Sequence, residues 1–111
     1  MNKRRPIPQG TLDMLILQTL ARKSRQHGFE IAESIQERSE DVLLVEEGSL
    51  YPALQRLLVQ GWISGEWSRT ADHRRARYYQ LNASGRKQLA REIEQYRCVS
   101  AAIGRVLEPG I

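Results

Sequence analysis

The sequence predicts a mainly α-helical fold with a small β-hairpin, arranged as a winged helix-turn-helix followed by one long C-terminal helix. Three segments before residue 61 carry apolar residues at helical spacing. Two aromatic-rich segments, 62–68 and 75–81, then flank a polar turn and alternate in part with a period of two. A last helical pattern runs over residues 83–107. Three short helices followed by a hairpin are the plan of a winged helix, whose third helix enters the DNA major groove.

The first helix is predicted over residues 10–22, where apolar residues form two stripes on nearly opposite sides. A single small domain is expected to cover one stripe, so a second copy of the chain is the simplest cover for the other. The alternative is a central helix that is buried on both sides within the monomer. The first stripe contains Leu12, Leu15, Ile16, Thr19 and Leu20, and the second contains Met14, Leu17 and Ala21.

The second helix is predicted over residues 28–38, with its apolar positions turned inward. A short apolar connection or isolated strand follows at residues 41–45. The inward positions of the helix are Ile31, Ala32 and Ile35.

The third helix lies within EEGSLYPALQRLLVQGWI, residues 46–63, and Gly61 supplies its end. We predict a start near Glu47 with a distortion at Pro52, because acidic residues suit the positive end of a helix dipole. The alternative start has Ser49 as the N-cap, which would place Pro52 in the first turn. The buried stripe contains Leu50, Leu54, Leu57 and Leu58.

The other face of this helix suits neither a core nor an ordinary charged surface. Gln55 and Arg56 are the residue types that pair with adenine and guanine in the major groove. The N-terminus of a helix also favours anions such as phosphate. This face contains Gly48, Ser49, Tyr51, Pro52, Gln55 and Arg56.

The predicted hairpin has a polar turn, RTADHR, and a basic tip. Positive charge on this wing would lie against the phosphates of bound DNA. The alternative for an arginine-rich hairpin is a solvated loop. The basic residues are Arg69, Arg74, Arg75 and Arg77.

The last helix is predicted from Ala83 to Leu107, with Asn82 as its N-cap. At 1.5 Å per residue this helix would be about 40 Å long, which exceeds the width of a small domain. Its apolar residues form a short coiled-coil-like seam, which predicts a homodimer; the alternative is a helix that lies across its own domain. The predicted interface contains Met14, Leu17, Leu89, Ile93, Tyr96, Ile103 and Leu107.

Composition narrows the class of protein. The formal net charge of +4 and the pI of about 9.6 favour partners that carry phosphate. A single cysteine, Cys98, excludes an internal disulfide and a cysteine-built zinc site. We interpret it as a packing or surface residue, with a redox switch as the alternative.

The sequence predicts no metal site, no catalytic site and no membrane span. His27 and His73 lack further ligands nearby in the sequence, so they are predicted to be polar surface residues rather than part of a metal site. No nucleophile–base arrangement or phosphate-cradling glycine loop is present, so we expect neither an enzyme nor a cofactor. No apolar run approaches the roughly 18 residues of a membrane span, so we expect a cytoplasmic protein without a membrane partner.

Four motifs resemble those of the PadR family of bacterial transcriptional regulators: GTLDMLILQTL, HGFEIAESI, EEGSLYPALQRLLVQGWI and RRARYYQLNASGRKQL. The resemblance covers residues 10–90 and implies a homodimeric winged helix of the short subfamily, usually a repressor of a near-palindromic operator. Two departures are Phe29, where many members have tyrosine, and Glu46, where many have a serine or threonine cap. The family's recognition-helix contacts match Ser49, Tyr51, Gln55 and Arg56, and its basic wing matches Arg74, Arg75 and Arg77.

The resemblance also implies a small aromatic effector, because some family members bind flat aromatic ligands between the last helices of the dimer. Tyr96 occupies the matching aromatic position, and the alternative is ordinary interface packing. The residues that match this cavity are Ile7, Asp13, Met14, Tyr96 and Val99.

These observations predict a transcriptional regulator that binds double-stranded DNA. Residues 1–82 would form the DNA-binding domain with a basic N-terminal arm, and residues 83–111 would form the dimerisation helix. The alternative is a winged-helix module that binds another protein and does not read DNA sequence.

Overall fold

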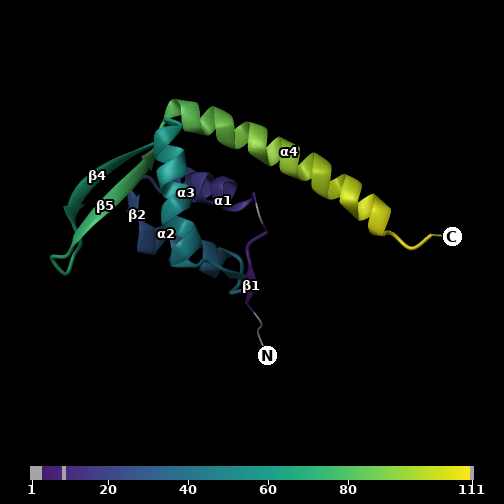
Figure 1. Cartoon of the computed structure of the whole chain (residues 1–111), viewed down its shortest axis with the longest axis horizontal. Coiled ribbons are helices and arrows are strands. Elements are labelled where there is room, and N and C mark those ends of the chain that lie inside the picture. Colours follow the sequence, from purple (N-terminus) through teal and green to yellow (C-terminus); the bar gives the residue numbers. More distant parts are fainter. Residues whose placement is uncertain (1–3, 9, 111) are drawn as a thin grey trace.

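A computed structural model describes residues 4–8 and 10–110, so the first three residues of the predicted basic arm lie outside the described part. Three helices gather against a small sheet, and a fourth helix extends away from them (Figure 1). In chain order the elements are β1 (Arg5–Pro6), α1 (Leu12–Arg22), β2 (Gln26–His27), α2 (Gly28–Arg38), β3 (Leu43–Leu44), α3 (Glu47–Val59), β4 (Ile63–Arg69), β5 (Arg75–Leu81) and α4 (Ala83–Leu107).

This order confirms the predicted winged helix with a long C-terminal helix. The third helix starts at Glu47, as expected, and Glu46 precedes it without a side-chain cap. Pro52 lies inside α3 on its exposed side. Proline cannot donate a backbone hydrogen bond to the carbonyl four residues earlier, here that of Gly48. The lost bond falls on a side of α3 that faces solvent, where water can take its place.

The two-residue strands β1 and β2 were not predicted, whereas β3 lies within residues 41–45, where an apolar connection or an isolated strand was expected. β1 pairs in parallel with β3, and the Arg5 backbone N–H donates to the Val42 carbonyl at 2.6 Å. β2 pairs with β5, which gives a three-stranded sheet in the order β2-β5-β4. Segments this short carry no readable alternation of apolar and polar residues. The β1–β3 pair matters for the site because it holds the chain before α1 beside the segment that enters α3.

The core surrounds α1, and this corrects the predicted dimer interface. Leu17 is 0% exposed and Met14 is 8% exposed within the single chain, so neither presents a free stripe to a partner. Leu89, on α4, is also buried in this core. α1 contacts α2 and α3 as well as β5 and α4, so both of its apolar stripes are covered. The alternative of a central helix buried on both sides within the monomer is therefore the one observed.

The first turns of α4 are anchored to the end of α3 and the start of β4. The Asn82 side chain accepts a hydrogen bond from the Gly85 backbone N–H at 2.8 Å and donates one to the Gly61 carbonyl at 2.7 Å. A Cβ at Gly85 would lie 2.1 Å from the Trp62 carbonyl oxygen, so only glycine permits this approach. The direction in which α4 leaves the domain is thus set by tight packing at its start.

The second half of α4 projects away from the remaining helices (Figure 1). Ile93 packs against the core, but the large apolar residues beyond it are about half exposed or more. No helix in the described ranges is both long and apolar enough to cross a membrane. The exposed apolar residues of this half are Tyr96, Val99, Ile103, Val106 and Leu107.

Candidate nucleic-acid interface

The exposed face of α3 is centred on small and uncharged residues. α3 buries Leu50, Ala53, Leu54 and Leu57, and successive residues turn by about 100° around a helix axis. The side directly opposite the buried one therefore carries Gly48, Pro52, Gln55 and Val59, all exposed. Gln55 is the only side chain of these four that can exchange hydrogen bonds with a base edge.

Arg56 lies at one edge of this face and is engaged with α1. Its Nη2 lies 2.8 Å from Asp13 Oδ1, and its Nε donates to Asp13 Oδ2 at 3.4 Å. The hydrogen bond to the Asp13 carboxylate, together with its negative charge, raises the pKa of Arg56 above its ordinary value. Both predicted residues are thus brought together, but Asp13 contacts a predicted DNA-binding residue instead of lining an effector cavity with Tyr96.

Tyr51 lies at the opposite edge of this face of α3, and its ring packs against the start of α2. A Cβ at Gly28 would lie 3.1 Å from the Tyr51 hydroxyl oxygen, so the ring packs against that glycine. About half of the Tyr51 side chain stays exposed. Tyr51 is therefore the residue through which α3 contributes to the groove between this helix and the wing, which is described below.

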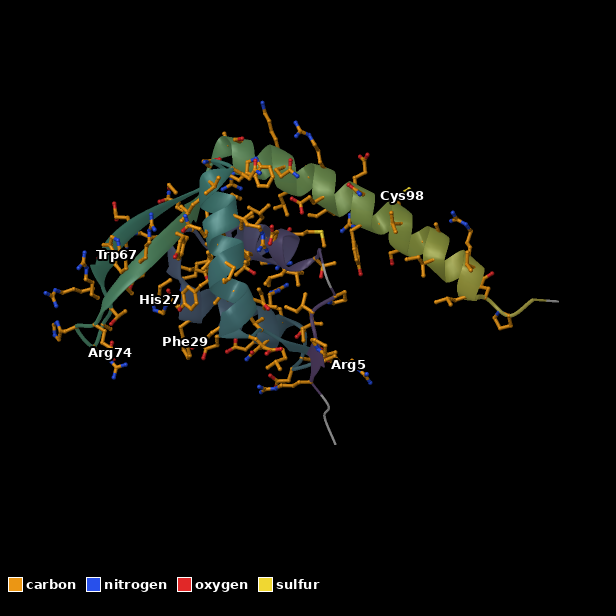
Figure 2. The ribbon with its side chains drawn as sticks, viewed as in Figure 1. Arg5, His27, Phe29, Trp67, Arg74 and Cys98 are labelled. Atoms are coloured by element: carbon orange, nitrogen blue, oxygen red, sulfur yellow. The ribbon has the colours of Figure 1, made fainter. Side chains whose placement is uncertain are left out.

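The four wing arginines are held in four different ways. Arg69 Nη1 donates to the His73 carbonyl at 3.2 Å and closes the turn. Arg74 lies at the tip, 3.6 Å from Asp72 Oδ2, and points into solvent (Figure 2). The guanidinium of Arg75 stacks over the Trp67 ring at 4.7 Å from its centroid. Arg77 packs across Gly65, where an added Cβ would lie 2.6 Å from its Nε.

Asp72 reduces the net charge of the wing tip. The hydrogen bond donated by the Thr70 hydroxyl lowers the pKa of Asp72, so this carboxylate is ionised beside Arg74. The remaining three arginines carry no acidic partner among the described residues. The face of the wing that carries Arg69, Arg75 and Arg77, called its inner side, is therefore the most positive part of the site.

A groove of about 650 Å³ runs between the wing, the start of α2 and α3. Its walls carry three exposed aromatic rings, those of Phe29, Tyr51 and Trp67, beside the basic side chains of the wing. Figure 2 places Trp67 on the wing and Phe29 near the start of α2. Such a groove can accept the sugar-phosphate backbone of a strand, because arginines neutralise phosphate while aromatic rings cover the sugar.

His27 is not the polar surface residue that was predicted. Its Nδ1 accepts from the Glu30 backbone N–H at 3.3 Å, and the Glu30 carboxylate accepts from the His27 backbone N–H at 3.0 Å. This reciprocal arrangement is a capping box that starts α2. The His27 ring also meets Tyr78 edge to face at 5.3 Å between centroids. His27 thus fixes the helix start that presents Phe29.

The start of α3 is acidic, which argues against a phosphate bound there. Glu46 and Glu47 are both exposed and form no ion pair within the described ranges. Their charges offset the anion preference of the helix N-terminus. Ser49, one turn in, remains exposed and available for a hydrogen bond.

The structure divides the predicted effector residues between two hollows. Met14, Tyr96 and Val99 line an open hollow of about 300 Å³ between α1 and α4. Ile7 and Asp13 line a different hollow of about 540 Å³, between the chain before α1 and the start of α3. The single chain therefore gathers only three of the five residues around Tyr96.

Sequence reasoning missed Trp67 as part of the site, although the hairpin register contains the signal. Trp67 pairs with Arg77, and Arg69 pairs with Arg75, so Trp67 and Arg75 are diagonal neighbours on one face of the hairpin. The Asp13–Arg56 pair had no such signal, because it joins residues 43 positions apart in two helices.

A family model and several solved structures resemble this chain. The model described as "Transcriptional regulator PadR-like family" matches residues 16–91. A PadR family transcription regulator from Clostridium difficile is 30% identical, with a TM-score of 0.74 over 89% of this chain and 100% of that chain. A transcriptional regulator from Clostridium thermocellum has a TM-score of 0.81 at 24% identity, over 90% and 96% of the two chains. Bacillus subtilis PadR in complex with operator DNA has a TM-score of 0.66 at 24% identity, over 75% of this chain and 47% of that one.

Proposed function

Because the chain belongs to the PadR-like family of transcriptional regulators, which are not enzymes, we propose that it binds a near-palindromic operator in double-stranded DNA as a homodimer and represses transcription. The observation that carries this proposal is the groove beside the wing, where arginines and exposed aromatic rings lie together with Tyr51, at the edge of the exposed face of α3. A protein bound to an operator that overlaps a promoter excludes RNA polymerase, so repression needs no second surface that contacts the polymerase.

Each part of the interface has a separate role in the proposal. α3 enters the major groove, where Gln55 contacts a base edge and Ser49 and Tyr51 contact the backbone. Arg69, Arg74, Arg75 and Arg77 neutralise phosphates next to that groove. The operator complex of Bacillus subtilis PadR supports this arrangement because its protein shares the fold.

The dimer is supported by the exposed apolar side of α4. Tyr96, Ile103 and Leu107 are half or more exposed, and no other part of the described chain covers them. Residues 83–111 would pair with their copy in a partner, while residues 1–82 would bind one half-site. Leu17 and Leu89 take no part in this pairing, because they are buried in the core.

An aromatic effector remains part of the proposal, with ordinary packing as its alternative. The hollow that contains Met14, Tyr96 and Val99 opens on the same side of α4 as the dimer residues, so a partner helix would close it. A planar compound stacked on Tyr96 would then be enclosed between α1 and the two last helices.

Salt dependence tests the proposed function. Four wing arginines in each of two protomers offer eight phosphate contacts, so log affinity for duplex DNA is expected to fall with log salt with a slope of about −4 to −7. Fluorescence anisotropy of a labelled duplex between about 50 and about 200 mM salt, where this effect is large, measures the slope. Binding that is flat with salt would favour the protein-interaction module instead.

A further inference from the structure

Arg56 is the only cationic residue between Glu47 and Val59, the whole length of α3. In the structure its guanidinium does not extend from the exposed face but turns to α1. The Asp13 carboxylate engages Nε and Nη2 together, at 3.4 Å and 2.8 Å. The side chains of Arg56 and Asp13 remain 58% and 26% exposed, so solvent reaches the pair.

This ion pair changes the charge that α3 would present to DNA. With Arg56 neutralised by Asp13, the charges left near the helix are those of Glu46 and Glu47, both exposed. The recognition helix is therefore net negative, and the four arginines of the wing supply the positive charge that attracts phosphate. A net negative element facing DNA is unfavourable unless its one cation is released from its internal partner.

The atoms that Asp13 occupies are the ones that nucleic acid would use. An arginine binds guanine O6 and N7, or two phosphate oxygens, through a pair of neighbouring N–H groups. Asp13 already takes Nε and Nη2, so a pair of acceptors on DNA must either replace the carboxylate or bind beside its negative charge. An exposed ion pair of this kind contributes little net free energy, so its replacement by a better placed acceptor pair is feasible.

We propose that Asp13 is an internal competitor for Arg56: α1 holds the arginine of the recognition helix until a guanine edge or a phosphate of the operator displaces the carboxylate. The inference rests on the proposed function and deepens it, because it makes Asp13 a residue that limits affinity for DNA. It also reassigns Asp13, which resemblance had placed in an effector cavity.

The test compares Asp13→Asn with wild type, with Arg56→Gln and with the double variant, each titrated with the duplex that the wild type enriches from a random pool. Asp13→Asn is expected to raise affinity about three- to tenfold, because Arg56 is released. In the Arg56→Gln background the same substitution should change affinity by less than about twofold, since no arginine remains to be released. Glu47→Gln is the matched control, because it removes one carboxylate that has no partner and should act equally in both backgrounds.

The same titrations identify what Arg56 binds. A salt slope about 0.9 steeper per released arginine would indicate phosphate. An unchanged slope with stronger preference for guanine at one position would indicate a base edge. Either result would support the proposal that Asp13 competes with DNA for Arg56.

Four results would overturn the inference. An equal gain from Asp13→Asn in both backgrounds would mean that only bulk charge matters. Weaker binding by Asp13→Asn when Arg56 is present would mean that the carboxylate positions the arginine for DNA. If the wild type binds duplex DNA tightly but the variants show no coupling, the inference is wrong and the proposed function is unaffected. If the wild type does not bind duplex DNA, both are wrong.

Discussion

Duplex DNA is expected to bind at least about 100-fold more weakly when Arg74 and Arg75 are both replaced by alanine, and the salt slope should become shallower by about 3 to 4. The homodimer would lose two arginines from each wing, and each phosphate contact contributes about 0.9 to the slope. Arg74 and Arg75 are exposed, so their removal should leave the fold intact. Arg77 is unsuitable for this test because it packs across Gly65 and supports the wing.

The control for this variant removes the same charge elsewhere. Arg91 and Arg105 are exposed on α4; Arg91 lies two residues before Ile93 and Arg105 two residues beyond Ile103, each about 200° around the helix. Replacing both by alanine should change affinity by less than about threefold, through the long-range field alone. Equal losses in the two double variants, measured by anisotropy at several salt concentrations, would mean that the wing makes no specific contact with phosphates.

Replacing Ile103 by aspartate is expected to convert the dimer to a monomer and to weaken operator binding by about 100-fold or more, because linked half-site binding would be lost. A carboxylate in an apolar helix seam carries a desolvation cost of several kcal/mol, as a rough magnitude. Ile103 is 53% exposed and outside the core, so the monomer should stay folded. Ile93 is a poorer choice, because it packs against the core.

Ala101→Asp is the matched control for the seam. Ala101 is exposed and lies about 200° around α4 from Ile103, so its carboxylate would face solvent in the dimer. Analytical ultracentrifugation at micromolar concentration distinguishes the two variants, and circular dichroism checks that both are folded. If Ile103→Asp sediments like the wild type, the apolar side of α4 is not the dimer interface.

The elements that were predicted well are those whose signals are local. The start of α4 follows from the Asn82 cap, and α2 follows from its apolar spacing. Ile63 and Leu81 are both buried and pair across the hairpin, in agreement with the predicted strands. Helix caps and strand alternation depend on neighbours within a few residues, so they can be read from the chain.

What could not be predicted depends on contacts between distant segments. The two stripes of α1 were predicted correctly as apolar, but part of what buries them is α4 and β5, which follow more than 50 residues later. Leu17 was therefore assigned to a partner when its own chain buries it. The contact between Arg56 and Asp13 could not be predicted, because the two residues lie in different helices.

The central claim is that two copies of this winged helix read one two-fold site in duplex DNA. Selection of bound duplexes from a random pool, followed by sequencing, tests it most directly. The account predicts an enriched near-palindrome whose half-sites are roughly one helical turn, ~34 Å, apart. It also predicts that Gln55→Ala enriches a different sequence within the same spacing. A pool that retains duplexes without any enriched motif, or that enriches a single half-site without symmetry, would contradict it.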